Sequence, residues 1–164
     1  MQKITAQQIR SSFINASRSE AAKLNLPRNF EALDWDNLDF LGWRDGKMPL
    51  RGYLIFPDGG SLTGVMLRAP EGGAKKNRSV LCEICRDVFS KEDVLLWVAR
   101  RAGASGRNGN TVGTLICADF LCSGNVRVEP PANDINPDPA EVVKRQIYGL
   151  QSRTRLFLDR VRGH

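Results

Sequence analysis

The four cysteines of the chain fall into two pairs whose spacing is suited to binding a metal ion. Cys82 and Cys85 form a C-x2-C pair, Cys117 and Cys122 form a C-x4-C pair, and the sequence contains no other cysteine. Two thiolates separated by two residues can bind one metal ion from a tight turn, and a second pair completes a tetrahedral set. Such a set leaves no open coordination position, which is typical of structural zinc. The sequence therefore predicts one structural Zn²⁺ held by Cys82, Cys85, Cys117 and Cys122.

Three other uses of these cysteines compete with zinc. Two disulfides would also pair them, but the N-terminus has no apolar signal-peptide core and nothing else suggests secretion. A redox C-x-x-C motif usually opens a helix after a parallel strand, and no such pattern precedes Cys82. Four unrelated buried thiols would not fall into two close pairs. The spacing favours zinc over all three.

The 31 residues between the two pairs predict a β-hairpin. Residues 94–102 and 111–117 have the composition of strands, and residues 103–110, GASGRNGN, have that of a turn. Asp119 can then cap a short helix that places Cys122 in or near its first turn. A cysteine knuckle, a hairpin and a helix start are the parts of a treble-clef zinc finger.

Two short helices are expected near the N-terminus. Thr5 with Gln8, and again Ser17 with Glu20, have the spacing of a capping box. Helices this short cannot fold alone and must pack on the rest of the chain. Residues 30–43 are rich in large apolar side chains, which we expect to fill a core.

A long helix is predicted after the proline-rich residues 129–137. Asp138 can cap it and Pro139 suits its first position. One apolar stripe then recurs at spacings of three and four residues. The stripe consists of Val143, Ile147, Leu150, Thr154, Phe157 and Val161.

These elements together predict an α+β fold. Antiparallel hairpins at about 51–68 and 94–117 would form the sheet, and helices would stand at both ends of the chain. We expect two parts, a short helical segment at residues 1–28 and a zinc-binding treble-clef domain at residues 29–164.

The formal net charge of +6 suits an acidic protein surface or a nucleic acid as partner. Arg100, Arg101 and Arg107 flank the Gly-rich turn. They could hold a phosphate or a carboxylate, or stabilise the charge of −2 that four thiolates leave on Zn²⁺.

No run of about 18 apolar residues is present, so no membrane span is expected. We expect a cytoplasmic protein.

The sequence offers no catalytic set. Its one histidine is His164, at the C-terminus, where nothing would hold it as a general base. No Walker or dinucleotide fingerprint is present. A zinc ion closed by four cysteines cannot activate water. The residues thus favour a binding protein and not an enzyme.

Several stretches resemble the FusB-type elongation factor G-binding proteins. They are the Cys82–Cys85 knuckle and residues 38–45 (LDFLGWRD), 98–103 (VARRAG) and 109–119 (GNTVGTLICAD). The resemblance covers about residues 30–162 and implies a treble-clef domain. It also implies binding to elongation factor G, which members that confer fusidic acid resistance help to leave the ribosome by contact alone.

The same resemblance implies contact residues near the knuckle, in the loop before the third cysteine and near the C-terminal end. At the matching positions stand Ile84, Arg107, Asn108, Thr111 and Phe157. The resistance proteins carry a larger N-terminal helical bundle than residues 1–28 provide. A resistance role and a housekeeping role in translation are therefore both open.

Two functions follow as hypotheses. The first is a monomeric protein that binds elongation factor G and associates with the ribosome. The second is a zinc-finger module that binds nucleic acid, such as ribosomal RNA, through Arg100, Arg101 and Arg107. No aromatic series at stacking spacing accompanies these arginines, which speaks against the second.

Overall fold

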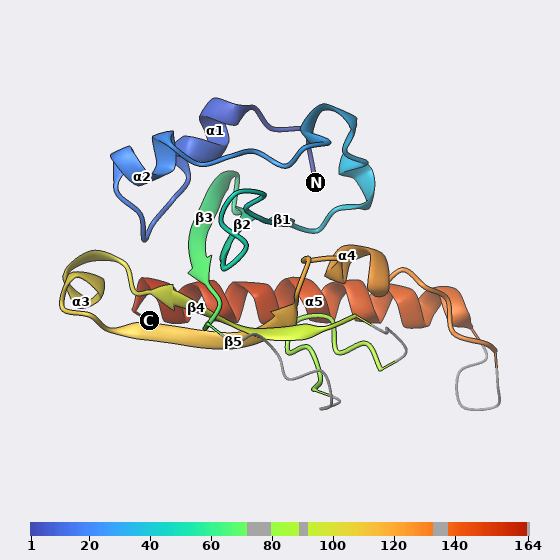
Figure 1. Ribbon diagram of the computed structural model, residues 1–164. Coiled ribbons are helices and arrows are strands. Elements are labelled where there is room, and N and C mark those ends of the chain that lie inside the picture. Colours follow the sequence, from blue (N-terminus) through green and yellow to red (C-terminus); the bar gives the residue numbers. More distant parts are fainter. Residues whose placement is uncertain (72–79, 89–91, 133–137, 164) are drawn as a thin grey trace.

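The fold is built around one antiparallel sheet, seen in a computed structural model that describes residues 1–71, 80–88, 92–132 and 138–163. Consecutive strands are neighbours throughout, in the order β1-β2-β3-β4-β5 (Figure 1). The predicted α+β class and both predicted hairpins are confirmed. The strands are β1 (Leu41–Arg44), β2 (Arg51–Asp58), β3 (Ser61–Arg68), β4 (Val94–Arg100) and β5 (Thr111–Cys117).

The two hairpins close differently. Between β2 and β3, Gly59 and Gly60 both have positive φ, of 58° and 88°, which glycine adopts without strain. Between β4 and β5 the predicted plain turn is instead a short helix, α3 (Gly103–Arg107). A Cβ on Gly106 would lie 1.7 Å from the carbonyl oxygen of Arg101. The glycines of this stretch therefore permit a compact helical turn that its composition alone does not reveal.

The sheet is nearly divided between β3 and β4. These strands pair only at Leu67 with Ala99 and at Arg68 with Val98. By contrast, β2 pairs with β3 and β4 with β5 along their whole lengths. The β4–β5 hairpin accordingly runs in a different direction from β3 (Figure 1).

Both faces of β2 are covered, so its side chains alternate between two cores. Leu54 and Phe56 belong to a core beneath the long helix α5 (Pro139–Arg162), while Tyr53 and Ile55 belong to a core beneath the N-terminal segment. This explains why β2 is continuously apolar and lacks the alternation of a half-exposed strand. The N-terminal segment, by which we mean here all residues before β1 (1–40), contains α1 (Ala6–Ser11), α2 (Arg18–Ala22), η1 (Phe30–Ala32) and η2 (Trp35–Asn37).

The helix caps predicted near the N-terminus and the C-terminus of the chain are confirmed. Thr5 with Gln8 and Ser17 with Glu20 form capping boxes on α1 and α2. Asp138 caps α5, with Pro139 in its first turn. The predicted core role of residues 30–43 also holds, since the buried side chains there include Phe30, Trp35, Phe40, Leu41 and Trp43. Along α5 the buried residues are Leu150, Thr154, Phe157, Leu158 and Val161.

A buried carboxylate, Asp45, fixes the loop between β1 and β2. It is 1% exposed and accepts hydrogen bonds from the backbone of Lys47 and Met48, the Tyr53 hydroxyl and the Asn25 amide. Burial raises the pKa of Asp45, but these hydrogen bonds outweigh it and leave the pKa lowered. Burial and the bond to Asp45 raise the pKa of Tyr53 to about 12.

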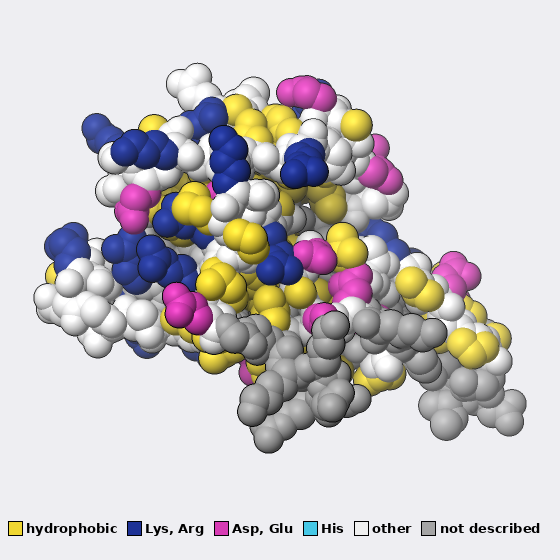
Figure 2. Space-filling model, viewed as in Figure 1, with side chains coloured by type: hydrophobic (Ala, Val, Ile, Leu, Met, Phe, Trp, Pro, Cys, Tyr) yellow, Lys and Arg dark blue, Asp and Glu magenta, His cyan; other side chains and the backbone are white. Residues whose placement is uncertain are grey.

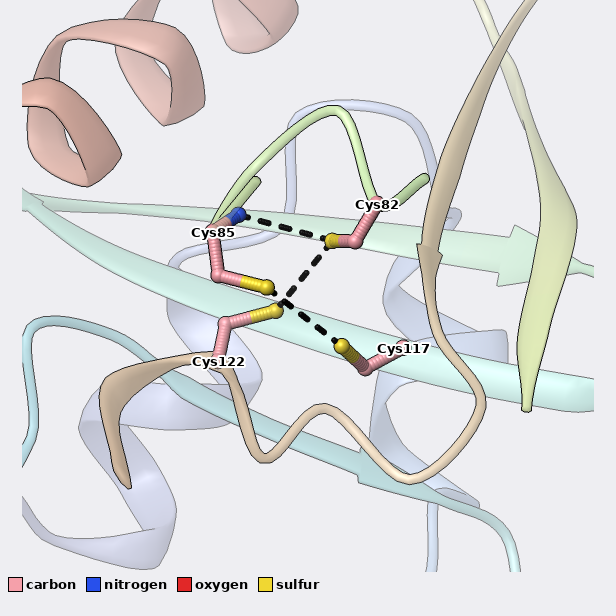
Figure 3. A group of neighbouring side chains, drawn as sticks. All are labelled: Cys82, Cys85, Cys117 and Cys122. Carbon is pink, nitrogen blue, oxygen red and sulfur yellow. Dashed lines mark hydrogen bonds between the residues drawn. The ribbon is translucent and has the colours of Figure 1, made fainter. Parts of the chain in front are cut away.

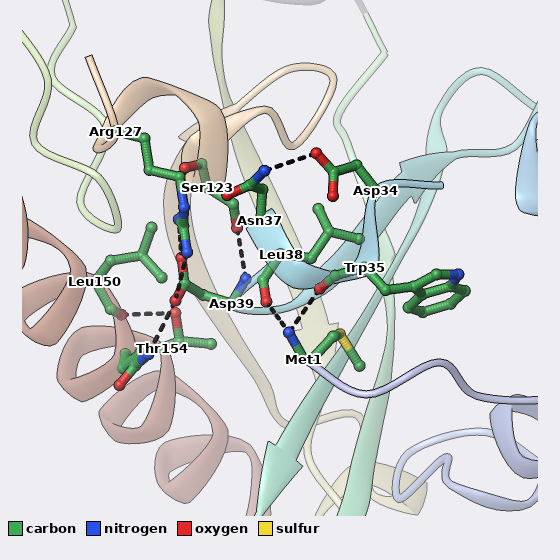
Figure 4. A network of polar contacts seen from close by, with 11 residues as sticks. Met1, Asp34, Trp35, Asn37, Leu38, Asp39, Ser123, Arg127, Leu150 and Thr154 are labelled. Carbon is green, nitrogen blue, oxygen red and sulfur yellow. Dashed lines mark hydrogen bonds and ion pairs between the residues drawn. The ribbon is translucent and has the colours of Figure 1, made fainter. Parts of the chain in front are cut away.

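A second polar network joins the N-terminal segment to the C-terminal helices (Figure 4). The buried Asp39 accepts hydrogen bonds from Arg127 and from the Gln151 amide, and its backbone N–H donates to Ser123 at 3.0 Å. The Met1 ammonium donates to the carbonyl oxygen of Trp35 at 2.7 Å. Within the described ranges, no helix is long and apolar enough to cross a membrane.

Candidate functional site

The four cysteines converge on one point, as predicted. Their sulfur atoms all lie within 4.8 Å of one another, and none of the four residues is more than 4% exposed. The Sγ atoms of Cys82 and Cys122 are 3.7 Å apart, and those of Cys85 and Cys117 are 3.6 Å apart (Figure 3). The two pairs, remote in sequence, thus form one buried cluster.

These distances fit a tetrahedral metal site. A zinc–sulfur bond of about 2.3 Å corresponds to sulfur–sulfur edges of about 3.8 Å. A disulfide would need about 2.05 Å, and all four cysteines are free. The disulfide pairing is therefore excluded.

Ionisation of all four cysteines would require a cation among the sulfur atoms. Hydrogen bonds from Cys117 and Cys122 lower the pKa of the Cys82 thiol, whereas contacts with Cys117 and Cys82 raise the pKa of Cys122. One thiolate suppresses the ionisation of its neighbours, so four thiolates cannot coexist here unless a positive ion neutralises them.

The knuckle is shaped by its own backbone. The N–H of Cys85 donates to the sulfur of Cys82 at 3.4 Å, and the N–H of Arg86 donates to the carbonyl of Cys82 at 3.0 Å. Arg86 takes a left-handed conformation with φ of 55°. The N–H of Glu83 bonds to the carbonyl of Leu115 at 2.8 Å, which fastens the knuckle to β5.

The fourth cysteine begins α4 (Cys122–Asn125), as predicted, but the predicted cap is wrong. Leu121 occupies the N-cap position and no side chain caps the helix. Asp119 is exposed and lies 3.5 Å from Arg44, in an ion pair. The chain leaves β5 by a tight turn, in which the N–H of Phe120 donates to the carbonyl of Cys117 at 3.0 Å.

Phe120 anchors the loop between the third and fourth cysteines. Its φ is 61°, it is 4% exposed, and its ring lies 4.9 Å from that of Trp97. The ring fits over two glycines of the sheet, because a Cβ on Gly42 or Gly52 would come within 2.8 Å of it. The metal cluster is thereby coupled to β1 and β2.

The groups around the sulfurs differ from the expected ones. The Asn125 amide donates to the sulfur of Cys117 at 3.5 Å. Arg153 on α5 donates from Nε to the carbonyl of Ile84, at the tip of the knuckle, at 2.8 Å. Arg100 pairs with Thr111 at the end of the hairpin opposite Cys117. The strand from Thr111 to Cys117 spans about 20 Å. Arg100 is therefore too far from the thiolates to stabilise them.

The predicted contact residues separate into exposed and buried ones. Ile84 and Phe157 are each 1% exposed and belong to the core beneath α5, so their side chains are not offered to a partner. The exposed ones are Arg100, Arg107, Asn108 and Thr111, and Arg101 is half-buried beside them. His164 lies outside the described residues.

The exposed residues gather around α3, together with the end of α5. The N–H of Ala102 donates to the carbonyl of Val161 at 2.8 Å, which brings the two elements into contact. The cysteine knuckle instead lies beside Thr114 and Leu115 of β5, to which Glu83 is hydrogen-bonded. The 103–111 loop and the end of α5 therefore share one surface that does not include the knuckle.

Comparison with known proteins agrees with this architecture. The family model described as "FBP C-terminal treble-clef zinc-finger" matches residues 8–161. The solved structure of the fusidic acid resistance protein FusC is similar, with a TM-score of 0.56 and 18% sequence identity. The match covers 91% of this chain and 59% of FusC, and at this identity it shows a shared fold. No curated protein matches the sequence significantly.

The family match and the buried cysteines agree on the cofactor. A treble-clef zinc-finger family together with four sulfur atoms at metal-binding distance supports one structural zinc ion, as the spacing predicted.

Proposed function

Because the chain belongs to the FBP C-terminal treble-clef zinc-finger family, we propose that it is a non-catalytic protein that binds elongation factor G. The match over residues 8–161 is the observation that carries this proposal. The similar solved structure is that of a fusidic acid resistance protein, which is consistent with a role in translation. Release of the factor from the ribosome is the activity that we propose for the complex.

In this proposal the metal centre is a scaffold. Cys82, Cys85, Cys117 and Cys122 are the proposed ligands, and bound Zn²⁺ would neutralise their thiolates and cross-link the knuckle to β5 and α4. Because four sulfurs close the coordination sphere, no position is open to a substrate. The chain's own hydrogen bonds, from Asn125 and Arg153, orient the cluster from outside.

The proposed contact region is the α3 end of the hairpin. It presents three exposed residues: Arg107 at the end of α3, Asn108 directly after it and Thr111 at the start of β5. The two strands that flank α3 are paired with each other. A rigid loop loses little conformational entropy when a partner binds. The guanidinium of Arg107 can form paired hydrogen bonds with a carboxylate, which suits an acidic partner.

Calorimetry with purified elongation factor G tests the proposal. The double variant Arg107→Ala with Asn108→Ala should weaken binding by about 1–3 kcal/mol if the pair sits at a buried contact. Zinc content and melting temperature should stay unchanged, because both side chains are exposed. Lys144→Ala, an exposed cation on α5, is the control for loss of charge. If the wild-type protein does not bind the factor, the proposal is wrong.

A nucleic-acid-binding role is the second candidate, because Arg100, Arg101 and Arg107 border a common hollow. Arginines gathered in this way can hold phosphate groups. A pull-down from lysate with and without nuclease separates the two functions. Capture of elongation factor G that survives nuclease treatment supports the protein partner, and capture that depends on RNA supports the second candidate.

A further inference from the structure

Three hollows on the surface adjoin one another in a line. The first, of about 350 Å³, is lined by residues that include Met48, Leu50 and Arg68. The second, of about 280 Å³, shares Arg68 and extends to Val98 and Arg100. The third, of about 260 Å³, shares Arg100 and ends at Arg107. We call this continuous surface the trough, defined by Met48, Leu50, Arg68, Val98, Arg100 and Arg107.

The nearly divided sheet accounts for the trough. Since β3 and β4 pair at only two positions, the ladder between them stops at Leu67 and Ala99 and does not continue to Met66 and Arg100. Continued pairing would place Met66 opposite Arg100, but the Asn15 amide instead donates to the carbonyls of both residues, at 2.9 and 3.0 Å, and both residues line the second hollow. The buried Asp45 holds the β1–β2 loop at one end of the trough, through the backbone N–H of Met48.

The N-terminal segment supplies a wall at the other end. Ser17 and Glu20 line the third hollow together with Arg101 and Arg107. Glu20 accepts a hydrogen bond from Arg100 at 2.8 Å and is itself fixed by the capping box with Ser17. Arg100 is therefore paired with Glu20 on one side, while 53% of its side chain stays exposed to a partner.

The charge of the trough is positive and one of its ends is apolar. The three hollows are lined by five arginines against two glutamates, Glu20 and Glu71. Met48 and Leu50 are 39% and 40% exposed, at the end away from α3. Figure 2 shows Lys and Arg side chains gathered below the N-terminal helices, with hydrophobic side chains beside them.

We propose that the trough binds an extended segment of a protein partner, in which an apolar side chain lies against Met48 and Leu50 and carboxylates lie against Arg100 and Arg107. This inference rests on the proposed function, for which it names the recognition surface. Pockets for small molecules usually have volumes of about 300–1,000 Å³. Two of the hollows are smaller than this, and the third is at the low end of the range. A row of such hollows suits successive side chains of one peptide.

The lining also favours a peptide over RNA. None of the described residues that line the three hollows is aromatic, so the trough lacks the aromatic platforms on which single-stranded bases usually stack. The glutamates at both ends would repel a continuous phosphate backbone, whereas a peptide can place neutral side chains beside them.

The first experiment uses the full-length zinc-loaded protein, labelled with ¹⁵N, and a synthetic peptide rich in Glu and Leu. Shifts of amide signals confined to the trough are the expected result. A peptide with Gln in place of each Glu should bind at least about tenfold more weakly, because the charged contacts are lost. Shifts spread over other surfaces, or stronger binding of a single-stranded RNA oligonucleotide in the trough, would overturn the proposal.

The second experiment uses variants of the trough with matched controls. Arg68→Glu and Leu50→Asp should each weaken binding of the peptide and of elongation factor G by about tenfold or more. The controls Lys144→Glu and Leu156→Asp make the corresponding changes, cation to Glu and Leu to Asp, at exposed positions on α5 and should bind like the wild type. Unchanged thermal unfolding would show that the variants are folded.

The outcomes separate this inference from the proposed function. If the wild type binds elongation factor G and the trough variants bind it equally well, the trough is not the recognition surface and the proposed function stands. If the wild type binds the peptide in the trough but not the factor, the proposed function fails and the trough remains a site for an acidic segment of another protein.

Discussion

Replacing Arg153 with methionine tests whether α5 holds the cysteine knuckle in place. The Nε of Arg153 donates to the carbonyl of Ile84 at 2.8 Å, and methionine keeps an apolar stem but cannot donate. Losing a hydrogen bond from a charged group costs about 1.5–3 kcal/mol. For a domain of this size, that lowers the melting temperature by about 3–12 °C. Since the knuckle carries two of the proposed ligands, zinc affinity should fall by roughly 10–100-fold.

Thermal unfolding by circular dichroism and competition with a chromophoric zinc chelator measure the two effects. Lys144→Met is the matched control, because Lys144 is exposed on the same helix and bonds only to Glu141 among the described residues. Its effect on stability should stay within about 0.5 kcal/mol. If Arg153→Met melts and holds zinc like the wild type, the contact does not brace the knuckle and the reasoning is refuted.

Three further predictions concern the metal, the loop at Asp45 and the ring of Phe120. Removing zinc with a chelator withdraws a contribution of about 10–16 kcal/mol. Hydrogen exchange should then show loss of protection across the described residues between 80 and 127, and a native exchange pattern would contradict a structural role. The lowered pKa of Asp45 means that its carboxylate stabilises the fold fully above the unfolded pKa, near about 4. That stability is lost as the pH falls through the folded pKa. The difference between wild type and Asp45→Asn in urea unfolding should therefore be large at neutral pH and shrink in acid, and a difference independent of pH would count against the network. Phe120→Ala empties the space over Gly42 and Gly52 and should cost about 3–5 kcal/mol in urea unfolding. A cost below about 1 kcal/mol would mean that the ring does not anchor the loop.

The features that the sequence predicted well depend on residues close together in the chain. The C-x2-C and C-x4-C pairs, the capping boxes at Thr5 and Ser17 and the Asp138 cap are all local patterns with a direct physical cause.

The turn at residues 103–110 was predicted as plain because glycine suits turns, yet Gly106 permits a helix whose backbone passes close to the Arg101 carbonyl.

The features that could not be predicted from the sequence depend on contacts between residues far apart in the chain. Arg153 precedes Thr154 of the apolar stripe, and nothing in the helical period marks it as the partner of Ile84. The fit of Phe120 over Gly42 joins residues far apart in the chain. Ile84 stands at the tip of a knuckle, where exposure is the natural expectation, but α5 covers it. Only the assembled sheet and helix decide these positions.

The position of α5 in the chain has a consequence for synthesis on the ribosome. This helix covers the face of β2 and β3 that carries Leu54, Phe56, Val65 and Leu67, and it follows every strand in the sequence. During translation the N-terminal segment and its core can form early, while the opposite face of the sheet waits for about 70 further residues to emerge. The nascent chain thus passes through a half-covered stage, in which an apolar sheet surface is open to chaperones or to other nascent chains.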